Sequence, residues 1–345
     1  MSLPILAITM GDVAGIGPEV VLKALAREEV YQICRPVVVG DPRALERDLP
    51  LTWGVRGIRV LRAVEEASFE PGSVDVLAPY KLQAHPLPRG RVHPEAGRAA
   101  VEFVREAVQL ALSGRVDGIV TAPLNKEALH RAGLPYPGHT ELLAELTRTR
   151  TYRMMLVGGG LKVVHVTTHV SVREACDMIT EGRVLETIRL AGEGLMRMGF
   201  PRPRIGVLGL NPHVGEKGLF GDEEKRAIEP AVRRAREEGW DVSGPLPPDT
   251  GFWRASEGEF DALVAMLHDQ GHIPLKLLAF HSCVNITLGL PIVRTSAGHG
   301  TAFEIAGEGK ADPSSILEAI EWAAHMTGGG TWRSQSGSGW GRSSR

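Results

Sequence analysis

Short apolar runs rich in β-branched residues alternate along the chain with longer stretches whose apolar residues recur every three or four positions. The short runs predict buried strands at 5–10, 36–39, 118–121, 162–168, 204–209 and 262–267. The longer stretches predict amphipathic helices at 95–112, 140–147, 184–198 and 223–238. Strands that alternate with helices are typical of a mainly parallel sheet covered on both faces, so we predict an α/β fold.

The length of 345 residues predicts two domains or one large α/β unit. The segment 328–345 differs from the rest, because glycine, serine and other small polar residues dominate it. Nothing in that segment can build a hydrophobic core. We therefore expect a largely disordered tail outside the fold.

The formal charge of −2 leaves no broad basic field for nonspecific binding of nucleic acid or of an anionic membrane surface. The three cysteines lie far apart and form no CxxC pair, so the sequence indicates neither a disulfide framework nor a thiolate zinc site. The first apolar run stops at Gly11 and follows no basic segment, which favours a strand over a secretion signal. We expect a cytoplasmic protein without a membrane span, which would need ~18 consecutive apolar residues.

Histidines follow three of the predicted strands, at His169, His213 and His268. Ligands of open α/β sheets bind at the carboxyl ends of the strands, so three imidazoles there are compatible with a metal site that keeps one open position. The alternative is that each histidine is a loop residue with a satisfied hydrogen bond, and the pattern alone leaves both readings open. His165 and His169 would lie about 13 Å apart on one face of a strand, so we assign His165 to the core.

Groups suited to an anion follow the third histidine at short intervals: Lys276, Asn285 and Arg294. Arginine offers a bidentate fork, lysine a point charge and asparagine an amide donor, a combination that suits phosphate. Arg294 lies in an apolar run and therefore needs an anionic partner. His139 and Thr140 precede a predicted helix, where Thr140 is either a simple N-cap or, with His139, directed at a ligand. The glycine-rich turn at 11–19 has neither the Rossmann nor the Walker spacing, and a tight strand-to-helix turn explains it equally well.

Taken together, several short motifs resemble those of the 4-hydroxythreonine-4-phosphate dehydrogenases of vitamin B6 biosynthesis. In chain order they are TMGD (9–12), GIGPE (15–19), TAPLNK (121–126), GHTE (138–141), TTH (167–169), GLNPH (209–213), PDT (248–250), MLHDQG (266–271), NITLGLP (285–291) and RTS (294–296). The resemblance spans residues 5 to about 313 in the order of the family. Any one motif is weak by itself, whereas the ordered set is highly specific.

The resemblance implies a fold like that of isocitrate and isopropylmalate dehydrogenases, with two α/β/α domains. We expect a discontinuous first domain (1–138 with 286–327), a second domain (139–285) that carries the metal site, and a homodimer whose metal and substrate sites are shared between subunits. The residues that the family would use to hold one divalent metal ion (zinc, cobalt or magnesium) are His169, His213 and His268. Those that it would use to bind a small phosphorylated substrate are His139, Thr140, Lys276, Asn285 and Arg294.

The cofactor implied is NAD or NADP. Residues 299–307 are similar to the adenosine-binding loop of isopropylmalate dehydrogenases, which nominates His299, Gly300 and Glu304 as cofactor-binding residues. An acidic Glu304 near the ribose would repel a 2′-phosphate and favour NAD. Two stretches depart from the family pattern, at Ala297–Gly298 and Phe280–Cys283, and the second removes a basic residue expected near the substrate.

The reaction implied is oxidation of 4-phosphooxy-L-threonine at its C3 hydroxyl, followed by decarboxylation to 3-amino-2-oxopropyl phosphate. The general base stays open between Asp249 and Asp269, and Asp269 is alternatively a group that orients His268. A sister dehydrogenase acting on a phosphorylated erythronate or threonate would keep the same metal and phosphate groups. A lyase that uses three histidines and zinc on phosphosugars would need no nicotinamide, and a phosphometabolite-binding protein would need no metal with an open position.

Overall fold

The computed structural model describes residues 2–328 and divides the chain into two compact units. Unit 1 contains the residues up to Thr149 together with those from Leu290 onward, and unit 2 contains Arg150–Gly289. We had expected the crossings near 138 and 285. The first crossing lies later because the helix α6 (His139–Leu146) packs against α4 (Pro94–Leu112) of unit 1. The tail expected at 328–345 lies, apart from its first residue, outside the described residues.

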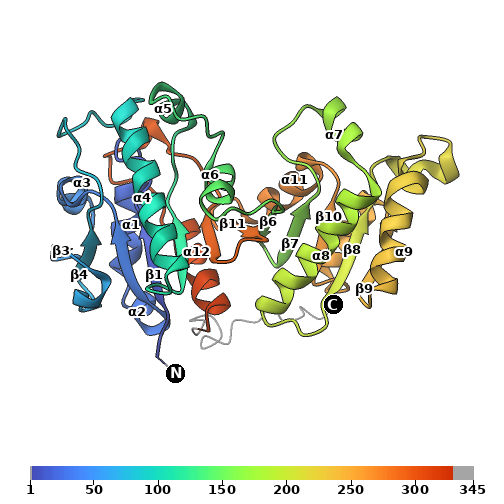
Figure 1. Ribbon diagram of the computed structural model, residues 1–345, viewed down its shortest axis with the longest axis horizontal. Coiled ribbons are helices and arrows are strands. Elements are labelled where there is room, and N and C mark those ends of the chain that lie inside the picture. The colour runs from blue at the N-terminus through green and yellow to red at the C-terminus, as the bar shows by residue number, and fades with distance from the viewer. Residues whose placement is uncertain (1, 329–345) are drawn as a thin grey trace, which may run out of the picture. The chain divides into compact units, whose positions relative to one another are not determined.

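Unit 1 is built on a parallel sheet. Its strands in spatial order are β3 (Gly57–Leu61), β4 (Ser73–Leu77), β2 (Arg35–Val39), β1 (Ile5–Thr9), β5 (Gly118–Thr121) and β12 (Val293–Ala297). Its helices are α1 (Gly17–Leu25), α2 (Glu28–Ile33), α3 (Pro42–Asp48), α4, α5 (Lys126–Arg131), α6 and α12 (Ser314–Met326). Short 3₁₀ turns lie at η1 (Leu49–Leu51), η2 (Val64–Glu66) and η5 (Phe303–Ile305). The long helix α4 packs on β1, β2 and β5, while α12 packs on β12, β5 and β1 (Figure 1).

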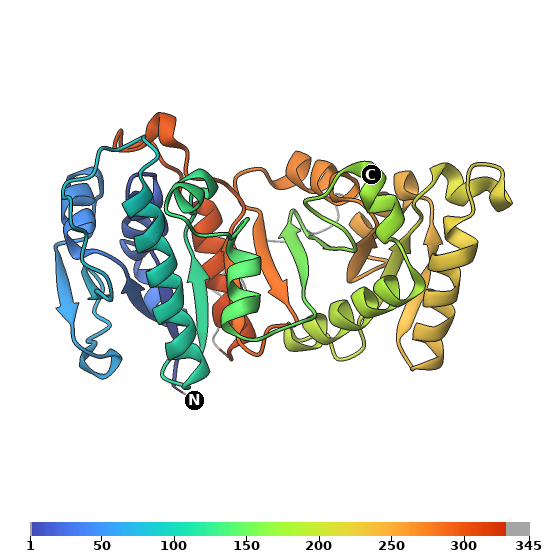
Figure 2. The same ribbon diagram turned by 45° about the horizontal axis from the view of Figure 1, so that its top comes forward.

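Unit 2 is built on a mixed sheet in which β6 runs antiparallel to both of its neighbours. Its strands in spatial order are β11 (Val284–Leu288), β6 (Arg153–Gly158), β7 (Leu161–His165), β10 (Ala262–Ala265), β8 (Arg204–Leu208) and β9 (Asp241–Leu246). Its helices are α7 (Val172–Met178), α8 (Glu181–Arg197), α9 (Glu229–Glu237), α10 (Pro248–Ser256) and α11 (His268–Ala279), with a 3₁₀ segment η3 (Pro212–Gly218) and a π-helical turn η4 (Glu224–Ile228). Helices α8 and α11 both pack on β6, β7 and β10, as the second view also shows (Figure 2).

The predicted α/β class is confirmed. The apolar strands and the helix caps of the sequence account for it. The central strands are mainly apolar and buried, as in β10, where all four residues are apolar and buried. Helices begin where the sequence supplies a cap: Asp41 accepts hydrogen bonds from the first turn of α3, and Asn125 does so for α5. In the described part of the chain, no helix is both long and apolar enough to cross a membrane.

Three predicted elements differ from the structure, and one of them is the strand expected at 162–168, which ends at His165. The helix expected at 223–238 is divided into η4 and α9, because Pro230 lies in the first turn of α9 and lacks the N–H that a continuous helix needs. The strand expected at 262–267 ends at Ala265, because α11 begins at His268. Because this strand ends early, His268 lies in the first turn of a helix and not in a loop.

Candidate active site

The three histidines predicted to bind a metal all follow neighbouring parallel strands of unit 2. The strands β7, β10 and β8 lie side by side, so their carboxyl ends share one edge of the sheet. His169 lies four residues beyond β7, His268 opens α11 directly beyond β10, and His213 lies five residues beyond β8. The topology therefore places each of them at the edge where ligands of such sheets bind.

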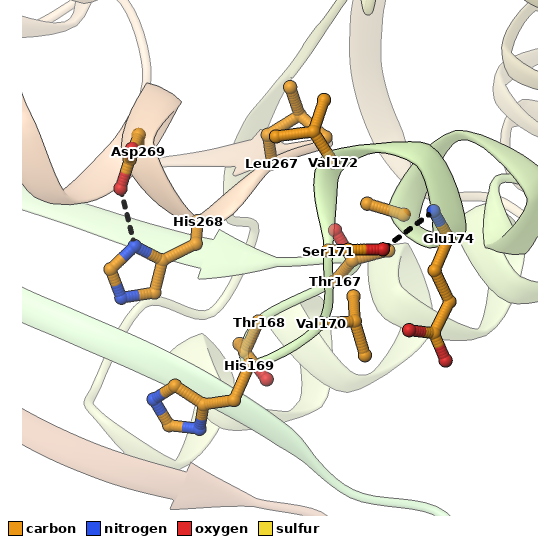
Figure 3. Close-up of a pocket in the computed structure, with 11 residues that line it drawn as sticks. Thr167, Thr168, His169, Val170, Ser171, Val172, Glu174, Leu267, His268 and Asp269 are labelled. Carbon is orange, nitrogen blue, oxygen red and sulfur yellow. Dashed lines mark hydrogen bonds and ion pairs between the residues drawn. The ribbon is translucent and has the colours of Figure 1, made fainter.

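The imidazole ring of His268 is held by a neighbouring carboxylate. Its Nδ1 lies 2.7 Å from Oδ1 of Asp269 (Figure 3). A carboxylate can only accept, so Nδ1 carries the proton and the lone pair of a neutral ring is on Nε2. Metal-binding histidines commonly donate their second N–H to a carboxylate in this way. Asp269 is itself 78% exposed, and its contact with His268 fits the orienting role better than that of a general base.

His169 lies close to His268. Their ring centroids are 5.8 Å apart, and both residues line a cavity of about 490 Å³ with Thr167, Ser171 and Glu174. Figure 3 shows the two rings on the same side of the segment that joins β7 to α7. Imidazole nitrogens bind zinc at about 2.0–2.1 Å, which separates the centroids of two rings on one ion by roughly 5–6 Å. This pair therefore fits a common transition metal ion.

His213 is not brought into that pair. It lines a separate cavity of about 380 Å³ with Lys217, Lys225 and Glu229. Among residues 2–328, no three histidine, cysteine, aspartate or glutamate side chains are arranged to hold a metal ion. The structure thus brings His169 and His268 near each other and leaves His213 apart from them, and the metal role of all three stays a prediction.

Two more imidazoles pack behind His268. The ring of His272, one helical turn later in α11, stacks on that of His268 at 3.6 Å between centroids. The Nδ1–H of His272 donates to the carbonyl oxygen of His268 at 3.0 Å. His165 lies behind His272 at 4.7 Å and is 1% exposed, which confirms its assignment to the core. Burial, and then the neighbouring imidazoles, lower the pKa of His165 to about 3 and that of His272 to about 4, so both rings are neutral at pH 7.

Unit 1 contains a buried cation at the corresponding edge of its own sheet. Arg294 lies in β12, is 1% exposed and donates from Nη2 to Oγ1 of Thr121 at 2.7 Å. Burial lowers its pKa to about 9, against the opposing charge of Glu141, so Arg294 remains charged at pH 7. His139 opens α6, and its Nε2 is buried and has no hydrogen-bond partner among the described residues. Burial and then the charge of Arg294 lower the pKa of His139 well below 6.5, which keeps it neutral.

The glycine-rich turn of unit 1 is joined to two other loops at the carboxyl ends of β5 and β12. The Asp12 N–H donates to the carbonyl oxygen of Pro123 at 2.9 Å, and the Ile16 N–H donates to that of Thr301 at 3.0 Å. Gly11 has φ of +69°, and a Cβ there would lie 2.2 Å from the oxygen of Pro123. Glycine is therefore required for both the conformation and the close approach.

The residues nominated for cofactor binding lie on this third loop of unit 1. The Nε2 of His299 is buried and has no hydrogen-bond partner within residues 2–328, and its Nδ1 lies 3.0 Å from the oxygen of Gly300. Glu304 is exposed in η5. Their cofactor roles remain predictions. Thr140 follows the first residue of α6 and is not its N-cap, because Gly138 takes that position.

The remaining predicted residues of unit 2 are distributed over three elements. Lys276 lies half-buried in α11, and Asn285 lies in β11 with its Oδ1 buried and without a hydrogen-bond partner among the described residues. Asp249 is exposed in the first turn of α10. The atypical stretch 280–283 follows α11, where Phe280 is 67% exposed and Cys283 is buried.

Sequence reasoning missed the side chains that tie the strand ends of unit 2 together. Gln270 accepts from the N–H groups of Met266 and Leu267 and donates to the carbonyl oxygen of Gly209, which joins the ends of β10 and β8. Thr167 donates to the carbonyl oxygen of Met266 at 2.7 Å, which joins the ends of β7 and β10. Glutamine at the third position of a helix is a known capping signal and could have been found. The bond to Gly209 has no signal in the sequence.

The fold and the two sheet edges define an α/β enzyme with an imidazole site in one unit and a buried cation in the other. Residues 32–323 match the model of the family described as pyridoxal phosphate biosynthetic protein PdxA, and the chain belongs to this family of dehydrogenases. It is 50% identical to the D-threonate 4-phosphate dehydrogenase of Cupriavidus necator over 94% of this chain and 97% of that protein. It is 46% identical to the 4-hydroxythreonine-4-phosphate dehydrogenase of Desulfosudis oleivorans over 93% of this chain and 95% of that one.

A solved structure agrees with these relatives. The crystal structure of a 4-hydroxythreonine-4-phosphate dehydrogenase from Klebsiella pneumoniae is 50% identical, covers 94% of this chain and 99% of that one, and superimposes with a TM-score of 0.86. The family resemblance read from the motifs is therefore confirmed. The dehydrogenase class excludes the lyase and the non-catalytic binding protein as leading interpretations.

Proposed function

We propose that this enzyme oxidises a four-carbon hydroxy acid phosphorylated at C4, with D-threonate 4-phosphate as the first substrate to test. The His169–His268 pair with its orienting Asp269 is the observation that carries the chemistry, because it provides imidazole nitrogens beside an accessible cavity. The relatives support the substrate class, since both names denote C4 phosphates of four-carbon acids. The amino acid 4-phosphooxy-L-threonine is the second candidate, and the two differ at C2, where one bears a hydroxyl and the other an amine.

The reaction balances as a hydride transfer followed by decarboxylation. The C3 hydrogen leaves as hydride to the nicotinamide of NAD or NADP, and the C3 hydroxyl loses its proton, which forms a C3 ketone. The bond between C1 and C2 then breaks and carbon dioxide leaves. The electron pair that remains on C2 takes up a proton. D-Threonate 4-phosphate would thus give dihydroxyacetone phosphate, and 4-phosphooxy-L-threonine would give 3-amino-2-oxopropyl phosphate.

The residues proposed to hold a divalent metal are His169, His213 and His268. All-imidazole ligation suits zinc or cobalt better than magnesium. A bound ion would supply Lewis acidity that lowers the pKa of the substrate hydroxyl. The protein's own contribution is orientation, because Asp269 fixes the tautomer of His268 and the stacked His272 limits rotation of its ring.

The proposed substrate contacts are those that the family resemblance nominates in each unit. In unit 1, Arg294 is a buried cation that remains charged, and the neutral His139 with Thr140 offers further hydrogen bonds. In unit 2, Lys276 supplies a cation and Asn285 an amide whose oxygen has no partner among the described residues. A phosphate with two negative charges suits such cations, and holding it would position C3 through remote binding energy. His299, Gly300 and Glu304 are retained as the proposed cofactor contacts.

We further propose a homodimer. The exposed face of α11 and its end carries large apolar side chains one turn apart: Ile273 (64% exposed), Leu277 (85%) and Phe280 (67%). Water contact of three such groups in a row is unfavourable, and a contiguous apolar patch of this kind is typical of a subunit interface. A second copy of this chain is the partner that the family resemblance implies.

The test is NADH formation at 340 nm with D-threonate 4-phosphate and 4-phosphooxy-L-threonine in parallel, each with zinc, cobalt or magnesium ions. His169→Ala and His268→Ala are the matched variants, and His130→Ala, outside the site, is their control. Turnover of the threonate ester that requires metal and is lost in the two site variants would support the proposal. Equal or faster turnover of the amino acid would shift the substrate to the second candidate, and full activity of both site variants would refute the metal site.

A further inference from the structure

The loop that carries His213 has an unusual backbone. Five consecutive residues, 213–217, have positive φ, and four of them are not glycine, with φ between +44° and +61°. The left-handed conformation is unfavourable for a non-glycine residue, because its Cβ comes too close to the following carbonyl oxygen. It is least expected for the β-branched Val214. Such strain persists only where the surrounding contacts determine the conformation, and it is often found at functional sites.

A buried carboxylate contacts the segment that leads into this loop. Glu224 is 2% exposed, and its Oε1 accepts from the N–H groups of Leu210 at 2.9 Å and Asn211 at 2.8 Å. Its Oε2 accepts from the side-chain amide of Asn211 at 2.9 Å. The two N–H groups belong to the segment through which the chain leaves β8, immediately before His213.

The Glu224 carboxylate also lies close to the backbone that follows His213. A Cβ on Gly215 would lie 3.0 Å from Oε2 of Glu224, and one on Gly209 would lie 3.2 Å from Oε1. The chain therefore approaches Glu224 closely both before and after His213. Glu224 itself begins the π-helical turn η4, a rare conformation that is frequent at functional sites.

We propose that Glu224 is a positioning residue that anchors the start of the loop carrying His213, the third proposed metal ligand. The inference rests on the proposed metal role of His213. In this role Glu224 contacts neither the substrate nor the metal ion, and it acts through the backbone before His213. It replaces the water that would otherwise solvate the N–H groups of Leu210 and Asn211, and it thereby holds the strained loop in one conformation.

The experiment is a Co²⁺ titration of the purified full chain, followed by the visible absorption of the bound ion, which reports affinity and coordination independently of turnover. The variants are Glu224→Ala, Glu224→Gln, His213→Ala and the double variant Glu224→Ala/His213→Ala. Glu223→Gln is the matched control, because Glu223 also contacts the Asn211 side chain but not the backbone of the loop. Circular dichroism and the melting temperature of each variant establish that it is folded.

Glu224→Ala is expected to weaken Co²⁺ binding by roughly 10- to 100-fold, the range typical of groups that orient metal ligands. Glu224→Gln should restore part of the affinity, because its amide oxygen can still accept from Leu210 and Asn211. The double variant should bind no more weakly than His213→Ala, since Glu224 acts through His213.

Two results would overturn the inference while leaving the metal site intact. The first is wild-type affinity and spectrum in a folded Glu224→Ala protein. The second is an equal loss from Glu224→Ala with and without His213, which would indicate a general effect on unit 2. If His213→Ala alone binds Co²⁺ as the wild type does, the proposed ligand role of His213 fails, and the inference fails with it.

Discussion

Asp12 offers a test of how burial in unit 1 affects stability. Its side chain is fully buried, Oδ1 accepts from the Ala14 N–H at 2.8 Å, and Oδ2 has no hydrogen-bond partner among the described residues. Burial raises the pKa of this carboxyl from 3.8 to about 6, and the bond from Ala14 opposes the shift only in part. The perturbation is Asp12→Asn, which keeps an acceptor for Ala14 and imitates the protonated acid.

The sign of the effect follows from proton binding. Below the unfolded pKa of 3.8 the carboxyl of Asp12 is neutral in both states and contributes nothing. Between that value and about 6 the folded protein binds the extra proton, so its free energy of unfolding falls as the pH rises. Each pKa unit corresponds to about 1.4 kcal/mol, so the shift destabilises the ionised native state by about 3 kcal/mol.

The assay is urea unfolding of the wild type and Asp12→Asn at several values from pH 4 to 8, followed by far-ultraviolet circular dichroism. The slope against urea must be the same for both proteins, so that midpoints can be compared as free energies. We expect the variant to gain on the wild type by up to about 3 kcal/mol between pH 4 and pH 7. The control is Asp222→Asn, which should show no such gain, because Asp222 is an exposed carboxylate that pairs with Arg226. A difference between Asp12→Asn and wild type that stays constant over this range would refute the reasoning.

Three further outcomes are expected. Asp269→Asn should weaken zinc or Co²⁺ binding by roughly 10-fold or more, because the amide orients His268 poorly; an unchanged dissociation constant in a titration would contradict this. Leu277→Glu should convert the proposed dimer to monomer in sedimentation velocity, because it places a charge in the apolar face of α11, and a dimer of unchanged stability would exclude this face from the interface. Gly271→Ala should destabilise unit 2 by about 1–3 kcal/mol in thermal unfolding, since its Cβ would lie 2.3 Å from Nε2 of His165, and an unchanged melting temperature would show that His165 can move.

The proteins that share this family need not share one substrate, and the comparison bears on this chain directly. The relative named for D-threonate 4-phosphate is 50% identical, and the relative named for 4-hydroxythreonine 4-phosphate is 46% identical. The difference in identity is small, so the choice depends on the group that meets C2 of the substrate. The stretch 280–283, which lacks the basic residue expected there, is where we would look first for that preference.

Much of the fold was accessible from the sequence, because strand and helix periodicities differ and the central strands are continuously apolar. The runs at 5–10 and 118–121 became β1 and β5 almost to the residue. His165 was assigned correctly to the core, although the strand expected to carry both His165 and His169 ends at His165. The family also followed from motif order, since ten short motifs in one sequence order are improbable by chance.

Other features were decided only by tertiary structure. The sequence determined that His169, His213 and His268 each follow a strand, but not that β7, β10 and β8 are neighbours, because strand order depends on how the crossovers pack. It did not reveal the carboxylate of Glu224 under the loop of His213, since the two are separated along the chain and meet only through long-range burial. Secondary-structure propensity depends on each residue and its near neighbours in the chain, so it can be predicted from the sequence. Contacts between distant residues exist only once the sheet has formed, and those contacts orient the groups that do the chemistry.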